Sequence, residues 1–328
     1  MESPKDTELL QQFETGVEAV EAGRKALETA FEEAMKSGDY SRFNELQRTV
    51  KASVYQAERI QRKLSGETFD PIILAEYKYK DEKGKESTES ITLNFETELA
   101  NWSDFYTQHG LTLPEDFAEK MQDIWERNAP AMEKEITEKG FDKVVFIPAS
   151  VDDINLKKLE EEMTKGYKEE AKKAGKPVND TYFGIDTTQV INSRTGDRIV
   201  LLHSVPDLTA QPELLKTLDK KYGGEKADTV DNKAQDFIDL GEQMTIPEWF
   251  ILQREIWEKT GVYIDGKITS DGNYIICPWL PGSRMGTEAG SGVLRASWDP
   301  DRARVFVDAY SPGLAYPAIG CRLSRCFD

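Results

Sequence analysis

The stretch RVFVDAYSPGLAYPAIGCRLSR, residues 304–325, decides the fold because its first seven residues alternate in character. Successive side chains of an extended strand point to opposite faces of a sheet. One face would carry Val305, Val307 and Ala309, and the other Phe306, Asp308 and Tyr310. The first set is small and aliphatic, as a core requires, whereas the second combines two rings and a carboxylate. The pattern predicts a strand with one buried face and one chemically mixed face.

The amino-acid composition of the region before this strand changes after Gly261. Charged helical residues give way to Gly, Pro, Ser, Trp and short apolar runs, which predicts a β-rich end with long loops. Before the change, TIPEWFILQREIWEKTG (residues 245–261) has apolar residues at helical spacing. We expect a helix whose buried stripe contains Trp249, Leu252 and Ile256.

At the other end of the chain, residues 7–64 have the apolar periodicity of two long helices. The segment KSGDYSRFNEL interrupts the pattern: Gly38 suits a helix C-terminus, and Asp39 or Ser41 suits the next N-cap. The sequence therefore predicts a helical hairpin, which would act as a packed arm, a spacer or a site of oligomerisation.

The middle of the chain alternates between strand and helix signals. Residues 72–79 and 90–95 read as a β-hairpin, and helical segments follow, one of which would open near Pro114. Further strands are expected at 144–147 and 199–202, separated by a charged helix over 154–175. The order of these signals indicates a mixed α+β chain.

Composition excludes several classes of protein. The formal net charge of −18 argues against general nucleic-acid binding, because phosphate contacts need an excess of Lys and Arg. No apolar run reaches the roughly 18–20 residues of a membrane helix, and the N-terminus has no hydrophobic leader. Cytoplasmic synthesis is the default expectation, and display at a surface stays open.

Motifs of catalysis and metal binding are missing from the sequence. The two histidines, His109 and His203, lie in different segments without metal-ligand spacing, and no nucleophile elbow or phosphate loop occurs. We therefore predict no catalytic residues, no metal and no cofactor. The odd count of cysteines (Cys277, Cys321 and Cys326) favours reduced thiols, although a Cys321–Cys326 bridge is geometrically conceivable.

Several C-terminal motifs occur together in a recognisable order: WLPGSR at 279–284, then Ala296 and Trp298, the alternating Val305 and Val307, and IGCR at 319–322. This order resembles the C-terminal module of variable proteins diversified by retroelements. Those proteins use a C-type lectin fold of the subtype shared with formylglycine-generating enzymes. The resemblance covers the last third of the chain and extends more weakly back to Phe141.

The resemblance implies a domain division and a binding surface. The expected parts are a helical hairpin (1–66), an α/β connecting region (67–139) and a C-type lectin-like ligand-binding domain (140–328). Val305, Val307, Ile319 and Gly320 match scaffold positions. The expected ligand-binding residues are Ser297, Trp298, Arg302, Arg304, Phe306, Asp308, Tyr310, Ser311, Leu314 and Tyr316.

The expected function is non-enzymatic recognition of an unidentified macromolecule, most simply a protein, since rigid aromatics and arginines suit such contacts. Three alternatives stay open. Phe306 and Tyr310 would, in a purely structural interpretation, pack beneath the N-terminal region. Cys321 and Cys326 would serve an oxidase of the formylglycine-generating type, or the first 64 residues would build a structural oligomer. For WLPGSR, we expect a turn in which Trp279 is core and Arg284 is structural.

Overall fold

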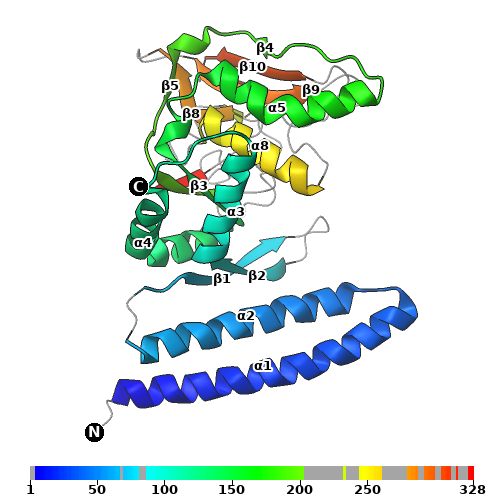
Figure 1. Ribbon diagram of the computed structural model, residues 1–328, viewed down its shortest axis with the longest axis vertical. Coiled ribbons are helices and arrows are strands. Elements are labelled where there is room, and N and C mark those ends of the chain that lie inside the picture. Colours follow the sequence, from blue (N-terminus) through cyan, green and yellow to red (C-terminus); the bar gives the residue numbers. More distant parts are fainter. Residues whose placement is uncertain are drawn as a thin grey trace. The chain divides into compact units, whose positions relative to one another are not determined.

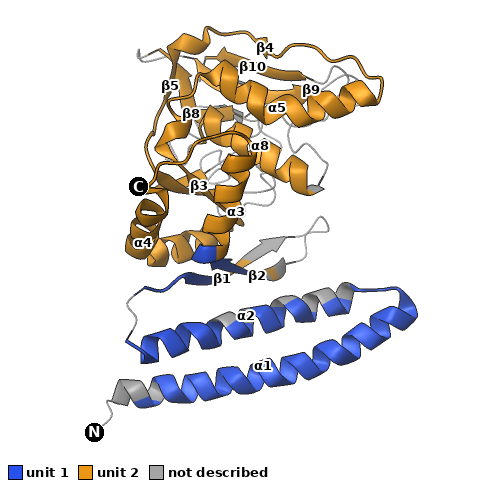
Figure 2. Ribbon diagram, in the orientation of Figure 1, with its two compact units in different colours: residues 1–75, 90–96 blue, residues 76–89, 97–328 orange. Residues whose placement is uncertain are grey.

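The computed structural model describes residues 4–66, 69–80, 86–202, 232–233, 244–260, 279–286, 292–299, 304–311, 315–316 and 324–328. Over these residues the chain mixes helices and β-sheets, which confirms the α+β prediction (Figure 1). It forms two compact units, residues 1–75 with 90–96 and residues 76–89 with 97–328 (Figure 2). Among the helices so described, none is both long and apolar enough to cross a bilayer.

The first unit contains the predicted helical hairpin, formed by α1 (Pro4–Ser37) and α2 (Ser41–Leu64). Gly38 ends α1 with a left-handed φ of 77°, and its N–H donates to the carbonyl of Ala34 at 2.8 Å. The N-cap of α2 is Tyr40, so the expected cap at Asp39 or Ser41 was wrong. Asp39 lies one residue too early, and its own N–H is held by the Ser37 hydroxyl at 3.2 Å.

A β-hairpin follows, built from β1 (Ile72–Lys80) and β2 (Glu86–Asn94). The predicted second strand was displaced, because Phe95 opens α3 (Phe95–Gln108) instead of closing the strand. The N–H of Phe95 donates to the carbonyl of Pro71 at 2.7 Å, which ties the start of the helix to the base of the hairpin. After α3 comes α4 (Phe117–Lys139), which ends at the left-handed Gly140.

The second unit contains a three-stranded antiparallel sheet with the order β12-β6-β3. Its strands are β3 (Lys143–Ile147), β6 (Arg198–Leu202) and β12 (Ser324–Phe327). All five residues of β6 are buried, as expected for a central strand. Side chains of α3 bond to the backbone of β3: Trp102 Nε1 donates to the Val144 carbonyl at 3.1 Å and Tyr106 Oη to the Phe146 carbonyl at 2.8 Å.

A second, five-stranded sheet has the order β4-β10-β9-β8-β5. Its strands are β4 (Tyr182–Phe183), β5 (Val190–Asn192), β8 (Trp279–Met285), β9 (Val293–Asp299) and β10 (Arg304–Tyr310). β4 runs parallel to β10, and the other neighbours are antiparallel. A two-stranded ladder joins β7 (Asn232–Lys233) to β11 (Ala315–Tyr316).

One face of this sheet is covered by α8 (Ile246–Thr260), which contacts β8 and β9 (Figure 1). α5 (Leu156–Lys173) packs against α8 and reaches the sheet through Tyr167, whose ring meets that of Trp298 in β9. The stripe predicted for α8 is buried at Trp249, Leu252 and Ile256, which confirms that prediction. Phe250 and Ile251 are buried as well, so this helix is enclosed on most of its circumference rather than on one side.

The WLPGSR segment is strand β8, so the expected turn was wrong. Contacts distant in the sequence hold it extended. The N–H of Gly282 donates to the Met244 carbonyl at 2.9 Å, and the Ser283 hydroxyl accepts from the Ile246 N–H at 2.8 Å. A Cβ on Gly282 would come within 2.8 Å of the Met244 backbone, so only glycine fits this approach.

Candidate functional site

The two faces of β10 differ in burial as predicted at Val305 and Val307, whereas Ala309, expected on the buried face, is only half-buried. Val305 and Val307 are fully buried, each with 0% of its surface exposed. On the opposite side of the strand, the side chains are half-buried; they are Arg304, Phe306, Asp308 and Tyr310. We call this side of the five-stranded sheet the outer face, and the side that meets α5 and α8 the core face. The outer face is the candidate functional site.

One cluster of the outer face centres on Arg295 of β9, the register partner of Asp308. Its guanidinium donates to both carboxylate oxygens of Asp308, from Nε at 2.6 Å and from Nη2 at 3.0 Å. Nη2 also donates to the Tyr310 hydroxyl at 3.1 Å, and Arg295 Cζ lies 4.3 Å from the centre of the Tyr310 ring. A two-pronged contact of this kind fixes both side chains in orientation. The tyrosine ring is therefore held in place by contacts within the chain.

A second cluster lies further along the same strand. Arg304 Cζ is 4.2 Å from the centre of the Phe306 ring, a cation–π distance. The Phe306 ring is in turn 5.7 Å from that of Tyr182, its register partner on β4. Tyr182 is 50% exposed, so this edge of the sheet presents an aromatic surface. Sequence reasoning missed Tyr182, because a two-residue parallel strand carries almost no periodic signal.

Register extends the outer face across β8 to β5, the other edge of the sheet, but its middle is covered: Val293 and Trp279, which register places on this side, are each 0% exposed. Arg284 pairs with Val293 on one side and with Ile191 on the other. Ile191 is exposed, and Arg284 is half-buried. Arg284 thus joins Arg295 and Arg304 on one face of a protein whose net charge is −18. Arginines and aromatic rings together are the residue types that dominate the energetic centres of protein interfaces.

Two residues expected to bind ligand lie elsewhere. Trp298 is 4% exposed, and its ring packs edge-on against Tyr167 of α5 at 4.4 Å. It pairs with Val305 and so belongs to the core face, which corrects its place in the predicted set. Ser297 lies on the outer side opposite Phe306 but is 3% exposed, so it is covered within this chain.

The remaining expected residues are only partly described. Ser311 is exposed directly after β10. For Tyr316 the structure gives the backbone position in β11, and Arg302, Leu314, Ile319 and Gly320 lie outside the described residues. The same holds for His203, Cys277 and Cys321.

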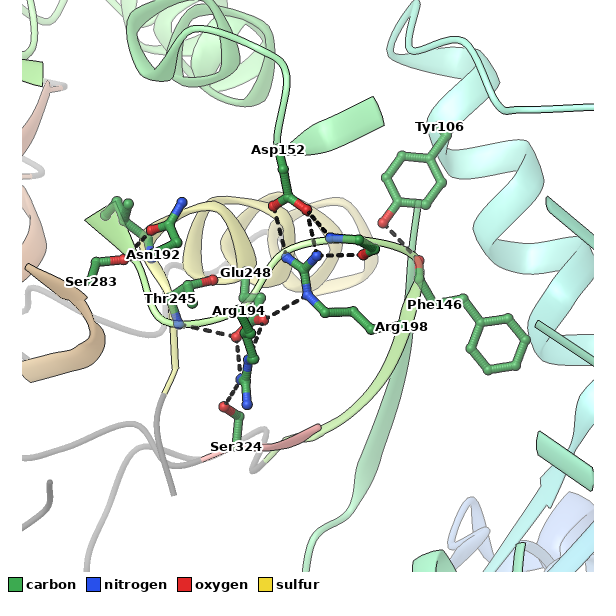
Figure 3. A network of polar contacts seen from close by, with 12 residues as sticks. Tyr106, Phe146, Asp152, Asn192, Arg194, Arg198, Thr245, Glu248, Ser283 and Ser324 are labelled. Atoms are coloured by element: carbon green, nitrogen blue, oxygen red, sulfur yellow. Dashed lines mark hydrogen bonds and ion pairs between the residues drawn. The ribbon is translucent and has the colours of Figure 1, made fainter. Parts of the chain in front are cut away.

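A buried ionic network joins segments far apart in the sequence (Figure 3). Glu248 of α8 is fully buried and accepts from both Arg194 and Arg198, with the Arg194 Nε–Oε1 distance 2.8 Å and the Arg198 Nε–Oε1 distance 3.2 Å. Arg198 also donates to Asp152 at 2.7 Å, and Arg194 donates to the Ser324 hydroxyl. The Thr245 N–H completes the carboxylate's partners at 3.0 Å.

Electrostatics in this network favour the charged forms. Burial raises the pKa of Glu248, but the two guanidinium groups and the Thr245 N–H outweigh it and hold the pKa below its usual value. Burial lowers the pKa of Arg198, and Glu248 and Asp152 raise it further than burial lowers it. The network links β6, α8 and β12 with the loop before β6, so it supports the sheets structurally. Sequence reasoning missed it because isolated charges in RIVLL and TIPEWF carry no sign of their partners.

Cys326 and His109 are the cysteine and the histidine that lie within the described residues, and both are surrounded by other side chains. Burial raises the pKa of the Cys326 thiol to about 11, so it stays protonated near neutral pH, which does not favour a reactive thiolate there. His109 packs against Phe105 at 4.6 Å between ring centres, and its Nε2 lies 3.0 Å from a Glu258 carboxylate oxygen. Over the described part of the chain, no group of three or more His, Cys, Asp or Glu side chains is arranged to hold a metal ion.

Comparison with protein-family models, with curated proteins and with solved structures finds no match to this chain. The functional argument therefore depends on the residues and geometry of the outer face.

Proposed function

We propose that this chain is a non-enzymatic ligand-binding protein that recognises a macromolecule, most simply another protein, through the outer face of its five-stranded sheet. The observation that carries the proposal is the division of β10 between a buried aliphatic side, Val305 and Val307, and a half-exposed side of rings and charges. Side chains on the exposed side can change without altering what the core packs against.

The geometry of the outer face supports recognition in a second way. The ion pair between Arg295 and Asp308 and the stacking around Tyr310 hold the polar and aromatic groups in fixed positions. Fixed groups lose little conformational entropy when a ligand binds, so more of the contact energy appears as affinity. The regular strands beneath them give the site a rigid base.

The finer part of the proposal is that the scaffold is a C-type lectin-like domain of a retroelement-diversified variable protein. It rests on the resemblance of the C-terminal motifs. An antiparallel β8–β9–β10 core with α5 and α8 on one face is compatible with such a scaffold. In this proposal the outer face is the part of the domain that varies, and the core face is constant.

A pair of displayed libraries tests the proposed function. The first randomises Arg304, Phe306, Asp308 and Tyr310. The matched control randomises four exposed residues of α5, namely Lys158, Glu161, Lys165 and Glu169. Both are selected for binding to lysozyme as a probe protein. We expect clones with specific binding to emerge from the first library and not from the second. Equal yields from the two libraries would remove the claim that the outer face is a specialised recognition surface.

A further inference from the structure

The helical hairpin of the first unit has a regular packing seam. From Phe13 to Ala34 in α1 and from Phe43 to Leu64 in α2, the residues that face the other helix recur at alternating spacings of three and four. This is the heptad pattern of a coiled coil. Gly16 lies against Ala57, and Gly23 lies so close to Val50 that a Cβ on it would come within 2.5 Å of a Val50 methyl. The two helices therefore run antiparallel and approach closely.

A second apolar stripe repeats on α1 outside this seam. Leu10, Val17 and Phe31 follow one another at heptad positions, with Arg24 between them, and they are 40%, 38% and 46% exposed. The antiparallel register places Val54 of α2 on the same side of the hairpin. Tyr40, the N-cap of α2, is 40% exposed and lies beside Met35 of α1, to whose sulfur its hydroxyl donates at 3.3 Å. We call the side with Leu10, Val17, Phe31 and Val54 the apolar side.

The other side of the hairpin is polar. There Arg42 of α2 donates to Glu33 of α1 at 2.8 Å across the helices. Ala19 is the matched exposed position of α1 on this side. A hairpin that needed only its own seam would have no reason to be apolar on one side and polar on the other, since both sides of an isolated hairpin would meet water.

Charge indicates what covers the apolar side. α1 contains eight acidic and four basic residues, whereas α2 contains two acidic and six basic residues. The hairpin is therefore electrostatically complementary to itself: α1 of one copy matches α2 of another. A two-fold axis makes both such contacts at once, because each copy offers the same surface.

One side of the hairpin is also large enough to form a stable interface between two chains. The 24 residues of α2 span about 36 Å, and two helices side by side are about 20 Å wide. One side of the hairpin therefore offers roughly 700 Å², close to the ~800 Å² per partner of a standard interface. We propose that two copies of this chain associate through the apolar sides of their hairpins into an antiparallel four-helix bundle, with α1 of each copy against α2 of the other.

The test measures the mass of the full-length chain by light scattering at low salt over a range of micromolar concentrations. We expect twice the 37.2 kDa of a single chain. The variant Leu10→Glu with Val17→Glu should fall to the mass of one chain, because it places four carboxylates in the interface. The control Ala19→Glu, on the polar side, should keep the double mass. Circular dichroism checks that each variant retains its helices.

A charge-reversal pair protects the test against misfolding of the first variant. Glu21→Lys with Glu28→Lys changes two exposed residues of α1 and should weaken association roughly tenfold at low salt. Adding Lys51→Glu on α2 should restore part of the loss. A wild-type chain of single mass, an assembly of another size, or a double mass that survives both sets of changes with the helices intact would each overturn the proposal.

Discussion

Replacing Glu248 by Gln removes the negative charge at the centre of the buried network while keeping the size of the side chain. Arg194 and Arg198 would then lie close together, with the Asp152 carboxylate still paired to Arg198. Because both guanidinium groups are largely buried, the lost attraction is not replaced by water. Breaking a buried ion pair on one side costs about 3–5 kcal/mol. We expect a loss of that order in the free energy of unfolding of the second unit.

Urea unfolding followed by tryptophan fluorescence measures this loss, since Trp249 and Trp279 are buried in the same unit. With a denaturant slope of roughly 2–3 kcal/mol per molar, the midpoint should fall by about 1–2.5 M. Glu169→Gln is the control, an exposed residue of α5 for which we expect a change within about 0.5 kcal/mol.

The pH dependence provides an independent check. Glu248 has its pKa lowered in the folded protein, so the unfolded chain binds its proton more readily. Its contribution to stability is then present above the unfolded pKa and is lost as pH falls through the folded pKa. The difference in the free energy of unfolding between wild type and Glu248→Gln should therefore shrink as the pH falls below about 4.5. If the free energy of unfolding of Glu248→Gln lies within 1 kcal/mol of the wild-type value at neutral pH, the stabilising role of the network is refuted.

Two further outcomes follow from local geometry. Cys326 should react with iodoacetamide at pH 8 at least about tenfold more slowly than a free thiol, because burial raises its pKa to about 11. Quantitative peptide mass spectrometry measures the rate, and a rate equal to that of glutathione would contradict the burial. Gly282→Ala should destabilise the second unit by about 1–3 kcal/mol in thermal unfolding, since the new Cβ would lie 2.8 Å from the Met244 backbone. An unchanged melting temperature would mean that β8 and this backbone do not approach so closely.

The parts of the fold that the sequence predicts are those governed by local periodicity. The hairpin of α1 and α2 and the two-sided strand β10 follow from the spacing of apolar residues, and Gly38 marks the end of α1 as expected. These features need no knowledge of distant partners, because helix and strand geometry alone determine which side chains share a face.

The parts that sequence reasoning missed depend on contacts distant in the chain. We expect a turn at WLPGSR, but the structure forms strand β8 there, and the backbone bond from Gly282 to the Met244 carbonyl helps to hold it extended. The resemblance places Trp298 on the ligand surface, whereas its pairing with Val305 puts it on the core face, and such pairing cannot be predicted from one strand alone. Tyr182 reaches the outer face only through the parallel contact of β4 with β10.

The central claim is that β10 separates a constant core from a surface free to vary, and saturation mutagenesis of residues 304–310 tests it most directly. Each variant is displayed and scored for resistance to protease, which reports folding. We expect tolerance to substitution to alternate with a period of two. It should be low at Val305 and Val307, where substitution by Ala costs about 2 kcal/mol because buried apolar surface is lost. It should be high at the four outer residues, Arg304, Phe306, Asp308 and Tyr310. A profile without alternation, or with the rings and charges as intolerant as the valines, would contradict the account.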